Sequence, residues 1–289
     1  MPELPEVETI VSQLAPVVAG GRVVKATVDD PRWCSPEDPV RFARRLEGLV
    51  IEGLERRGKY LIWRFAKGLA LLQHLRMSGV ILLDPRERPN HLRATLRLRK
   101  GGRELELAVC DLRRFGTATL FAEREALERY LAARLGPEPF DDAFNGAYLR
   151  DRLRGRAVAI KAALLDQRLV AGVGNIYADE ALFRAGIDPC KEAGGLTAGE
   201  CEALVEGLRA ALRAGIDARG ASIENFRGID GVRGTFQDRF LVHRREGQPC
   251  PRCSAPIERL RVGGRSTYRC PRCQRTVARR RQAARRARR

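Results

Sequence analysis

Eight short segments between residues 22 and 121 have the pattern of β-strands, and this run restricts the fold of the chain more than any other feature. The turns between the segments contain Gly, Pro, Asn or charged residues, which commonly end strands. Polar and apolar residues alternate most clearly at 92–99 and 104–109. So many closely spaced strands predict a β-sandwich or barrel. The segments are 22–28, 49–57, 59–65, 69–75, 79–84, 92–99, 104–110 and 117–121.

Helical periodicity precedes the strands and dominates the second half of the chain. Residues 3–15 predict a helix that ends just before Pro16, with an apolar face of Val7, Ile10, Val11 and Leu14. Residues 216–239 are rich in glycine and polar residues and predict a long loop. Further helices are expected at 39–46, 123–135, 145–154, 160–168, 175–185 and 198–215. The last has an apolar face formed by Cys201, Leu204, Val205, Leu208 and Leu212.

The charge of the chain indicates a polyanionic partner. The formal net charge is +18 and the sequence pI is about 10.4. The residues after Cys273 contain eight arginines and no acidic residue, so the rest of the chain carries about +10 (18 − 8). We interpret 275–289 as a basic disordered tail that adds salt-sensitive affinity for phosphates. The chain shows no signal peptide and no apolar run of about 18 residues, so we expect a cytoplasmic protein without a membrane partner.

Two identical motifs, Cys250-Pro-Arg-Cys253 and Cys270-Pro-Arg-Cys273, are separated by sixteen residues. This spacing fits a tetrahedral site of four thiolates, whereas incidental buried cysteines would have to produce the motif twice by chance. Since no position is left for water, we expect one structural Zn²⁺ that contributes on the order of 10–16 kcal/mol of folding free energy. The remaining cysteines are interpreted as core or surface thiols; they are Cys34, Cys110, Cys190 and Cys201.

The residues between the two cysteine motifs predict a β-hairpin with Gly263-Gly264 at its turn. Arg265 would stand at the tip, where it is well placed to reach a phosphate or a groove. On spacing alone, a solvated turn residue is the commoner role for such an arginine.

The start of the chain, Met-Pro-Glu-Leu-Pro-Glu, has two interpretations. Removal of Met1 would leave Pro2 with a free secondary amine, and α-amino groups titrate near about 7.7–8.0, so part of it would be unprotonated at neutral pH. Such an amine can attack a sugar carbon and form an iminium, with Glu3 beside it to exchange a proton. In the simpler interpretation these residues only start a helix, with Pro5 in its first turn.

Gly172-Val173-Gly174-Asn175 lies between two predicted helices. Glycines let the backbone approach a phosphate closely, and Asn175 can cap the following helix and donate to an oxygen. An ordinary turn between helices explains the same residues equally well.

Taken together, these motifs resemble the bacterial formamidopyrimidine-DNA glycosylase family, in order from residue 2 to about 273. The Leu-Pro after Glu3 is similar to this branch, not to the sister endonuclease VIII enzymes. The motifs are PELPEVET, Gly58-Lys59-Tyr60, His74-Leu-Arg-Met77-Ser-Gly79, Asp111-Leu-Arg113-Arg114-Phe115-Gly116, Gly136-Pro-Glu-Pro139, Ala171-Gly-Val-Gly-Asn-Ile-Tyr177 and the zinc knuckles.

The resemblance implies an α+β protein that acts in base excision repair, as a monomer at the nucleoid. Its substrate would be double-stranded DNA containing oxidised purines, 8-oxoguanine and formamidopyrimidines. The expected domains are a β-sandwich catalytic domain at 1–136 with flanking helices, a helix-two-turn-helix domain with a lesion loop at 137–240, and a zinc-ribbon hairpin at 241–274. The tail at 275–289 lies outside the resemblance.

The resemblance also implies roles for single residues. Pro2 would attack C1′, Glu3 would donate the proton that opens the sugar, and Lys59 would serve β-elimination. Arg265 matches the position assigned to δ-elimination, and because arginine stays protonated we interpret it as a phosphate clamp. DNA contacts are implied for His91, Arg113, Arg156, Lys161 and Asn175, and the gap left by an extruded base would be filled by Met77, Arg113 and Phe115.

Two positions depart from the family pattern. The loop at 217–235 reads Gly231-Val-Arg-Gly234-Thr before Phe236, where a Lys-Pro-Gly-Tyr-Phe type of run is common. Arg76 stands where a glycine is usual. The alternatives are a glycosylase for pyrimidine lesions, a non-catalytic binder of damaged DNA, and an RNA-binding zinc-ribbon protein. The last leaves the N-terminal residues unexplained.

Overall fold

The computed structural model describes residues 2–223 and 226–275, which form two compact units. Both units combine separate stretches of the chain, whereas the predicted domains are contiguous. The predicted tail lies outside the described residues, apart from Arg275. Unit 1 contains the residues up to Phe144 with Asp166–Gly174 and Ala210–Arg239, and unit 2 contains Asn145–Leu165, Asn175–Arg209 and the residues from Phe240 onward.

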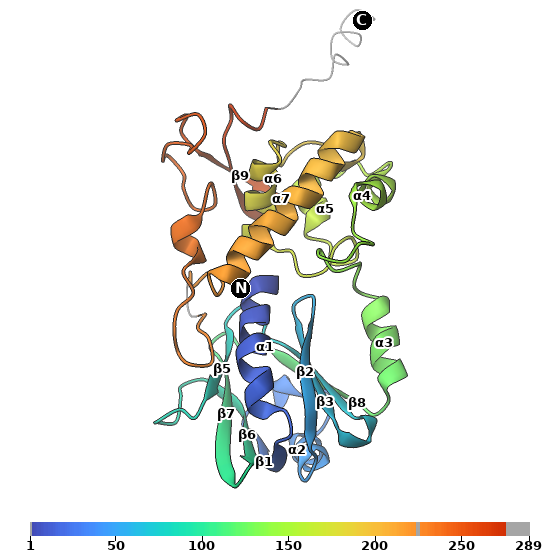
Figure 1. Cartoon of the computed structure of the whole chain (residues 1–289), viewed down its shortest axis with the longest axis vertical. Coiled ribbons are helices and arrows are strands. Elements are labelled where there is room, and N and C mark those ends of the chain that lie inside the picture. Colours follow the sequence, from blue (N-terminus) through green and yellow to red (C-terminus); the bar gives the residue numbers. More distant parts are fainter. Residues whose placement is uncertain (1, 224–225, 276–289) are drawn as a thin grey trace, which may run out of the picture. The chain divides into compact units, whose positions relative to one another are not determined.

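Unit 1 contains two four-stranded antiparallel sheets, and all eight predicted strands are confirmed (Figure 1). The first sheet has the order β1-β6-β7-β5 and the second β2-β3-β4-β8. Every neighbouring pair of strands is antiparallel, as in a sandwich. The strands are β1 (Arg22–Val28), β2 (Ile51–Arg57), β3 (Tyr60–Phe65), β4 (Ala70–His74), β5 (Gly79–Leu83), β6 (Leu92–Lys100), β7 (Arg103–Asp111) and β8 (Thr117–Phe121).

One apolar core joins the two sheets with the helices α1 (Leu4–Val18) and α2 (Pro39–Leu46). Trp63 of β3 is buried in it, and its indole N–H donates to the Gln73 side chain at 3.0 Å, which satisfies the polar atom of the ring. The outer side of the second sheet is covered by α3 (Arg124–Ala132), whose Leu127 and Leu131 pack on Ile62 and Leu72. Each sheet therefore buries apolar side chains as the alternating pattern predicts.

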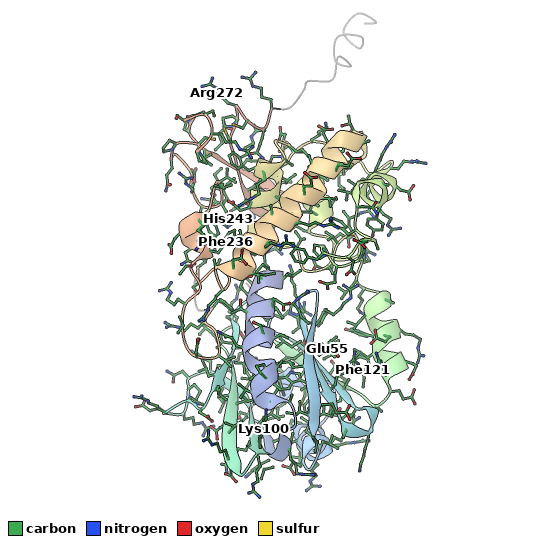
Figure 2. All side chains as sticks on the ribbon, viewed as in Figure 1. Glu55, Lys100, Phe121, Phe236, His243 and Arg272 are labelled. Atoms are coloured by element: carbon green, nitrogen blue, oxygen red, sulfur yellow. The ribbon has the colours of Figure 1, made fainter. Side chains whose placement is uncertain are left out.

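The first helix continues past Pro16 to Val18, so the predicted end at residue 15 is wrong. Proline cannot donate to the carbonyl of Ser12, but burial of an apolar side chain such as Val18 contributes about 1.5–3 kcal/mol and extends the helix by one turn. Lys100 satisfies the last carbonyls, since its Nζ donates to Pro16 O at 2.8 Å and to Val17 O at 3.1 Å (Figure 2).

Unit 2 contains helices and the cysteine hairpin. The predicted apolar face of α7 is buried, and the first part of this helix, up to Arg209, belongs to unit 2. Strands β9 and β10 pair antiparallel, and the hairpin turn Gly263-Gly264 has positive φ at both residues, as a two-residue type I′ turn requires. The elements are α4 (Gly146–Leu153), α5 (Ile160–Leu164), α6 (Asn175–Arg184), α7 (Ala198–Asp217), β9 (Glu258–Val262) and β10 (Arg265–Arg269).

Helix α5 ends at Leu164, four residues before the predicted end at 168. The Asp166 carboxylate accepts the Arg168 N–H at 3.1 Å, and the Asp166 carbonyl accepts the Leu169 N–H at 2.8 Å. Aspartate competes in this way with helical hydrogen bonds and starts a turn. None of the helices within residues 2–223 and 226–275 is both long and apolar enough to cross a membrane.

Candidate active site and metal centre

Pro2 and Glu3 are buried at the N-terminal end of α1. Glu3, which is 1% exposed, is the residue before the helix, and Glu6 in the first turn accepts the Glu3 main-chain N–H through Oε2 at 2.8 Å. Both carboxylates thus lie near the positive end of the helix dipole. Pro5 occupies the first helical turn, so Pro2 precedes the helix and is not needed to start it.

The turn at Ala171–Gly174 packs against this helix start. Gly172 has φ +85° and its carbonyl accepts the Leu4 N–H at 3.0 Å. A Cβ at residue 174 would lie 2.3 Å from Glu3 Cδ, so only glycine leaves room for the Glu3 side chain. The Gln167 side chain holds the turn from the other side, accepting from Gly172 N at 2.9 Å and donating to Val173 O at 2.8 Å.

Lys59 lies in the tight turn between β2 and β3 and is only 7% exposed. A Cβ at Gly58 would lie 3.3 Å from Ala171 Cβ, so this turn packs against the 171–174 segment. The Glu138 carboxylate fixes the turn, because it accepts from Gly58 N at 2.6 Å and from Arg56 and Arg57 at 2.7 Å each. Burial favours a higher pKa for Glu138, but Arg56 and these hydrogen bonds outweigh it and lower the pKa.

His74 of β4 lies opposite Tyr60 of β3, with the two rings edge to face at 4.7 Å. Burial, with the charges of Arg76 and Lys59, lowers the pKa of His74 to about 3. The imidazole is therefore neutral at physiological pH, and its Nδ1 accepts the Arg76 N–H at 2.9 Å.

Residue 2, a carboxylate and a lysine therefore gather around one turn of unit 1. The carboxyl group of Glu3 can hand over a proton, and the ammonium of Lys59 can move a proton or hold a phosphate. Because both side chains are buried, charge interactions are stronger at this site than in water. The signal that sequence reasoning missed is Glu138 of the Gly136-Pro-Glu-Pro139 motif, the acidic residue that holds the Lys59 turn.

The described part of the 217–235 loop is anchored on α1. Glu6 Oε1 accepts the Ala221 N–H at 2.7 Å, while Gln13 Oε1 accepts the Ile229 N–H at 3.1 Å. Phe226 and Ile229 are buried in the core that joins the sheets. One carboxylate, Glu6, thus bonds both the helix start and the base of the loop.

The predicted gap-filling residues stand on neighbouring turns of unit 1, together with His91, which is predicted to contact DNA. Phe115 is 52% exposed, Met77 is half-buried, and His91 is exposed. The Arg113 guanidinium lies 5.1 Å from the centre of the Phe115 ring, a cation–π contact that orients both side chains. Leu112, 49% exposed beside them, was not singled out by the sequence.

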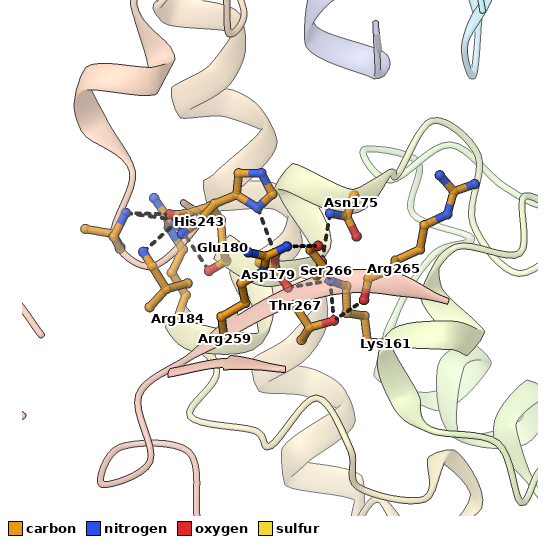
Figure 3. A network of polar contacts seen from close by, with 12 residues as sticks. Lys161, Asn175, Asp179, Glu180, Arg184, His243, Arg259, Arg265, Ser266 and Thr267 are labelled. Carbon is orange, nitrogen blue, oxygen red and sulfur yellow. Dashed lines mark hydrogen bonds and ion pairs between the residues drawn. The ribbon is translucent and has the colours of Figure 1, made fainter. Parts of the chain in front are cut away.

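In unit 2 a buried network surrounds Lys161, which is 0% exposed (Figure 3). Its Nζ lies 2.7 Å from Asp179 Oδ1 and donates to Ser266 O at 2.9 Å and Thr267 Oγ1 at 2.8 Å. The Asn175 amide donates to the same Ser266 carbonyl at 3.0 Å. Lys161 and Asn175, both predicted to contact DNA, thus hold the hairpin main chain.

Arg265 and Arg156 differ from Lys161 in exposure. Arg265 is exposed at the start of β10, and its side chain extends away from the network (Figure 3). Arg156 is half-buried, and its carbonyl accepts the Gly194 N–H at 2.9 Å. Of the predicted DNA-binding and catalytic residues in unit 2, Arg265 is exposed, Arg156 and Asn175 are half-buried, and Lys161 is fully buried.

Two adjacent acidic residues of α6 were missed by sequence reasoning. Asp179 bonds His243 Nδ1 at 2.8 Å in addition to Lys161. Glu180 accepts three successive main-chain N–H groups, those of Leu241, Val242 and His243, at 2.9–3.1 Å. The available signal was a pair of carboxylates placed among apolar residues of a helix, because buried acids need partners.

The four predicted metal ligands converge in unit 2. The sulfurs of Cys250, Cys253, Cys270 and Cys273 all lie within 4.8 Å of one another, with Sγ–Sγ distances of 3.9 Å for Cys250–Cys273 and 3.4 Å for Cys253–Cys270. Four thiolates bound at about 2.3 Å to a tetrahedral zinc would be about 3.8 Å apart. The donor set and its spacing therefore fit a structural metal centre.

Three family profiles match successive parts of the chain. They are the formamidopyrimidine-DNA glycosylase N-terminal domain at residues 1–118, the formamidopyrimidine-DNA glycosylase H2TH domain at 135–227, and the zinc finger found in FPG and IleRS at 247–276.

Curated relatives match over nearly the whole length. The formamidopyrimidine-DNA glycosylase of Gloeobacter violaceus is 45% identical over 276 residues, which is 93% of this chain and 95% of the relative. That of Symbiobacterium thermophilum is 44% identical over 271 residues, 93% of this chain and 87% of the relative.

Solved structures give the same match. The Lactococcus lactis enzyme in complex with DNA containing an abasic site superimposes with a TM-score of 0.87 at 35% identity, covering 95% of this chain and all of that one. A complex with DNA containing carbocyclic 8-oxoguanine gives a TM-score of 0.86 at 35% identity, with the same coverage.

Proposed function

Because this chain belongs to the formamidopyrimidine-DNA glycosylase family, we propose that its Pro2 forms the covalent bond to deoxyribose through which oxidised purines are excised. The protein is a DNA glycosylase for oxidative damage with AP lyase activity. The observation that supports the proposal most is the convergence of Pro2, Glu3 and Lys59 on the turn at Ala171–Gly174.

In the proposed first step the Pro2 nitrogen attacks C1′ of the damaged nucleotide. The glycosidic bond breaks and the base leaves with the bonding electron pair. The proton that the Pro2 nitrogen gives up passes to the departing base, and Glu3 donates a separate proton to the ring oxygen as the sugar opens. The product is an iminium between Pro2 and C1′. Glu3 suits this role because its carboxyl group is buried beside Pro2 and enclosed by Gly174.

The iminium makes the C2′ proton acidic, so loss of that proton expels the 3′ phosphate in a β-elimination. We propose that Lys59 moves the proton or binds the phosphate in this step. Its turn is fixed by the Glu138 carboxylate, which accepts from Gly58 N and from Arg56. Arg265, exposed at the hairpin tip, would bind the remaining phosphate and favour the second elimination.

The metal centre is proposed to hold a single Zn²⁺, because four thiolates with this spacing are the usual ligands of that ion. Bound zinc would keep the hairpin rigid and take no part in the reaction. We further propose that the protein acts as a monomer in the cytoplasm at the nucleoid, which its net charge of +18 favours. Light scattering of the purified protein tests the monomer directly.

Borohydride trapping tests the covalent step. A duplex with a single 8-oxoguanine should give a stable adduct, and mass spectrometry of the digested adduct should place the oligonucleotide on Pro2. Pro2→Gly should weaken trapping, acetylation of the amino terminus should abolish it, and an undamaged duplex should give none. An adduct on an internal lysine, or full activity after acetylation, contradicts the proposal.

A preference for pyrimidine lesions is the second candidate, since one Lactococcus lactis enzyme has been solved with DNA containing an oxidised pyrimidine. Excision of 8-oxoguanine and of thymine glycol from otherwise identical duplexes separates the two. We expect the faster reaction on 8-oxoguanine.

A further inference from the structure

A single buried aspartate joins the turns that carry the predicted gap-filling residues. Asp111, the last residue of β7, is 2% exposed. Its Oδ1 accepts the Ser78 hydroxyl at 2.5 Å and the Arg113 N–H at 3.2 Å, and its Oδ2 accepts the Gly116 N–H at 2.7 Å. The two oxygens of this carboxylate therefore bond a side-chain hydroxyl in one turn and main-chain N–H groups in another.

The main chain of Asp111 adds a third turn. Its N–H donates to the His91 carbonyl at 3.0 Å, and its carbonyl accepts the Arg114 N–H at 3.2 Å. Ser78 closes the cluster, because its hydroxyl oxygen also accepts the Arg113 N–H at 2.9 Å. The segments 76–78, 90–92 and 112–116, here called the three recognition turns, thus meet at one residue.

Each recognition turn contains a non-glycine residue in the left-handed conformation. The φ values are +56° at Arg76, +60° at His91 and +59° at Arg114. This region is unfavourable for residues other than glycine, and such residues persist there only where the surrounding structure fixes them. The Asp111 cluster supplies hydrogen bonds next to all three positions, so it opposes relaxation of the turns.

The recognition turns hold exposed side chains above the buried Asp111 carboxylate. Phe115 is 52% exposed while Asp111 beneath it is buried, and the Arg113 guanidinium stacks near the Phe115 ring. Filling the space of an extruded base with a side chain is more favourable when the side chain is already ordered, because less conformational entropy is lost on binding.

We propose that Asp111 is a positioning residue for base extrusion: it holds Met77, His91, Arg113 and Phe115 as one preorganised set. The proposal rests on the proposed function, since it concerns the step that precedes attack by Pro2. Asp111 itself lies below the surface and acts only through the turns that it bonds.

Asp111→Asn tests the proposal on two substrates. A duplex with 8-oxoguanine requires extrusion and gap filling, whereas a single-stranded oligonucleotide with an abasic site requires only the chemistry at Pro2. Asparagine has nearly the same shape but donates where the carboxylate accepts. We expect about a tenfold loss of single-turnover rate on the duplex, with less than about a twofold change on the single strand.

A matched control lies on the same pair of strands. Asp84 follows the far end of β5, and its Oδ1 accepts the Glu106 N–H at 2.6 Å, also at a strand end. Asp84→Asn should leave the ratio of the two rates at its wild-type value. Wild-type protein that fails to cleave either substrate contradicts the proposed function, whereas an active wild type with equal losses on both substrates in Asp111→Asn overturns this inference alone.

Ser78→Ala decides the question if Asp111→Asn does not fold. This substitution removes one donor to Asp111 and leaves the carboxylate in place. The ratio of the rate on the duplex to the rate on the single strand should therefore fall about threefold, while the melting temperature changes little. Fluorescence of 2-aminopurine placed beside the lesion follows unstacking directly, and its rise should be slower in the variant. An unchanged ratio and an unchanged fluorescence rise overturn the inference.

Discussion

The Glu3 side chain packs directly on the main chain of Gly174. A methyl group added at residue 174 would lie 2.3 Å from Glu3 Cδ and 2.5 Å from Oε1, closer than carbon atoms approach. Since the Glu3 N–H is fixed by Glu6, the side chain has to move. A turn far away in sequence therefore determines where the Glu3 carboxyl group, the proposed proton donor, lies.

Gly174→Ala should reduce the rate of base excision about 10- to 100-fold, because a displacement of about 1 Å at a reacting group can have that effect. Single-turnover excision of 8-oxoguanine measures it. Gly199→Ala is the control, since a Cβ there meets nothing within 4 Å and alanine favours a helix. An excision rate equal to wild type in Gly174→Ala would show that Glu3 has another position in the reaction.

Glu138→Gln should destabilise the protein by about 2 kcal/mol and slow β-elimination more than base release. The carboxylate compensates two arginines and accepts Gly58 N, so its loss frees the turn of Lys59. Urea unfolding and separate assays of base release and strand cleavage measure the two effects. The control is Glu128→Gln, which removes an ion pair with Arg64 at the surface. Its free energy of unfolding should fall by less than about 1 kcal/mol.

The lowered pKa of His74 predicts a loss of stability in mild acid. Below about pH 6.5 the unfolded chain binds a proton at His74, but the folded protein does not until about pH 3, so stability falls as the pH falls between these values. The slope approaches about 1.4 kcal/mol per pH unit. Urea unfolding between pH 6.5 and 4.5 measures it, and His74→Gln should flatten the curve. Equal slopes in both proteins contradict a neutral His74.

Removal of the metal should weaken DNA binding by more than about tenfold and leave the sheets of unit 1 folded. Cys250 and Cys270 belong to the small apolar core of the hairpin, so loss of the metal should loosen that core. Binding of an abasic-site duplex and far-ultraviolet circular dichroism are measured before and after chelation. Cys190→Ser, which removes an exposed thiol outside the cluster, should change neither. Simultaneous melting of sheets and hairpin would contradict the expectation.

Lys161→Met distinguishes a structural lysine from one that contacts DNA. A lysine with no exposure releases no counterion when DNA binds, so the slope of log affinity against log salt should not change. The product should shift from δ- to β-elimination, because the Ser266 carbonyl beside Arg265 loses a donor. A slope smaller by about one would instead indicate a direct phosphate contact. Asp151→Asn, which alters an exposed pair with Arg154, provides the control for stability.

Much of the fold could be predicted because local pattern and burial agree. The strands alternate between a buried and an exposed side, and the cysteine spacing leaves few arrangements for its ligands. Pro16 shows where such reasoning fails: its helix-breaking tendency is local, but the burial of Val18 is a property of the assembled core. The end of α5 at an aspartate turn is a similar case.

The sequence could predict which residues belong to the site, but not the contacts that those residues make. Nothing in the sequence around Lys161 distinguishes a lysine on the surface from one paired with Asp179, because the partner is eighteen positions away in another helix. Glu138 and Asp111 belong to motifs of the sequence, but the sequence does not indicate what either residue does. Each carboxylate accepts hydrogen bonds from main-chain N–H groups, and the sequence gives no sign of which main-chain groups will act as donors.

The division of the chain has a practical consequence for genetic dissection. The polypeptide leaves and re-enters unit 1 at Phe144, Asp166, Gly174, Ala210 and Arg239. A fragment cut after residue 136 would lack the 171–174 turn that encloses Glu3 and the segment that Glu6 anchors, and a fragment containing only the remainder would lack the sandwich. Truncation would therefore remove parts of the proposed catalytic centre along with the helices of unit 2, so point substitution in the full-length protein is the sound way to separate their contributions.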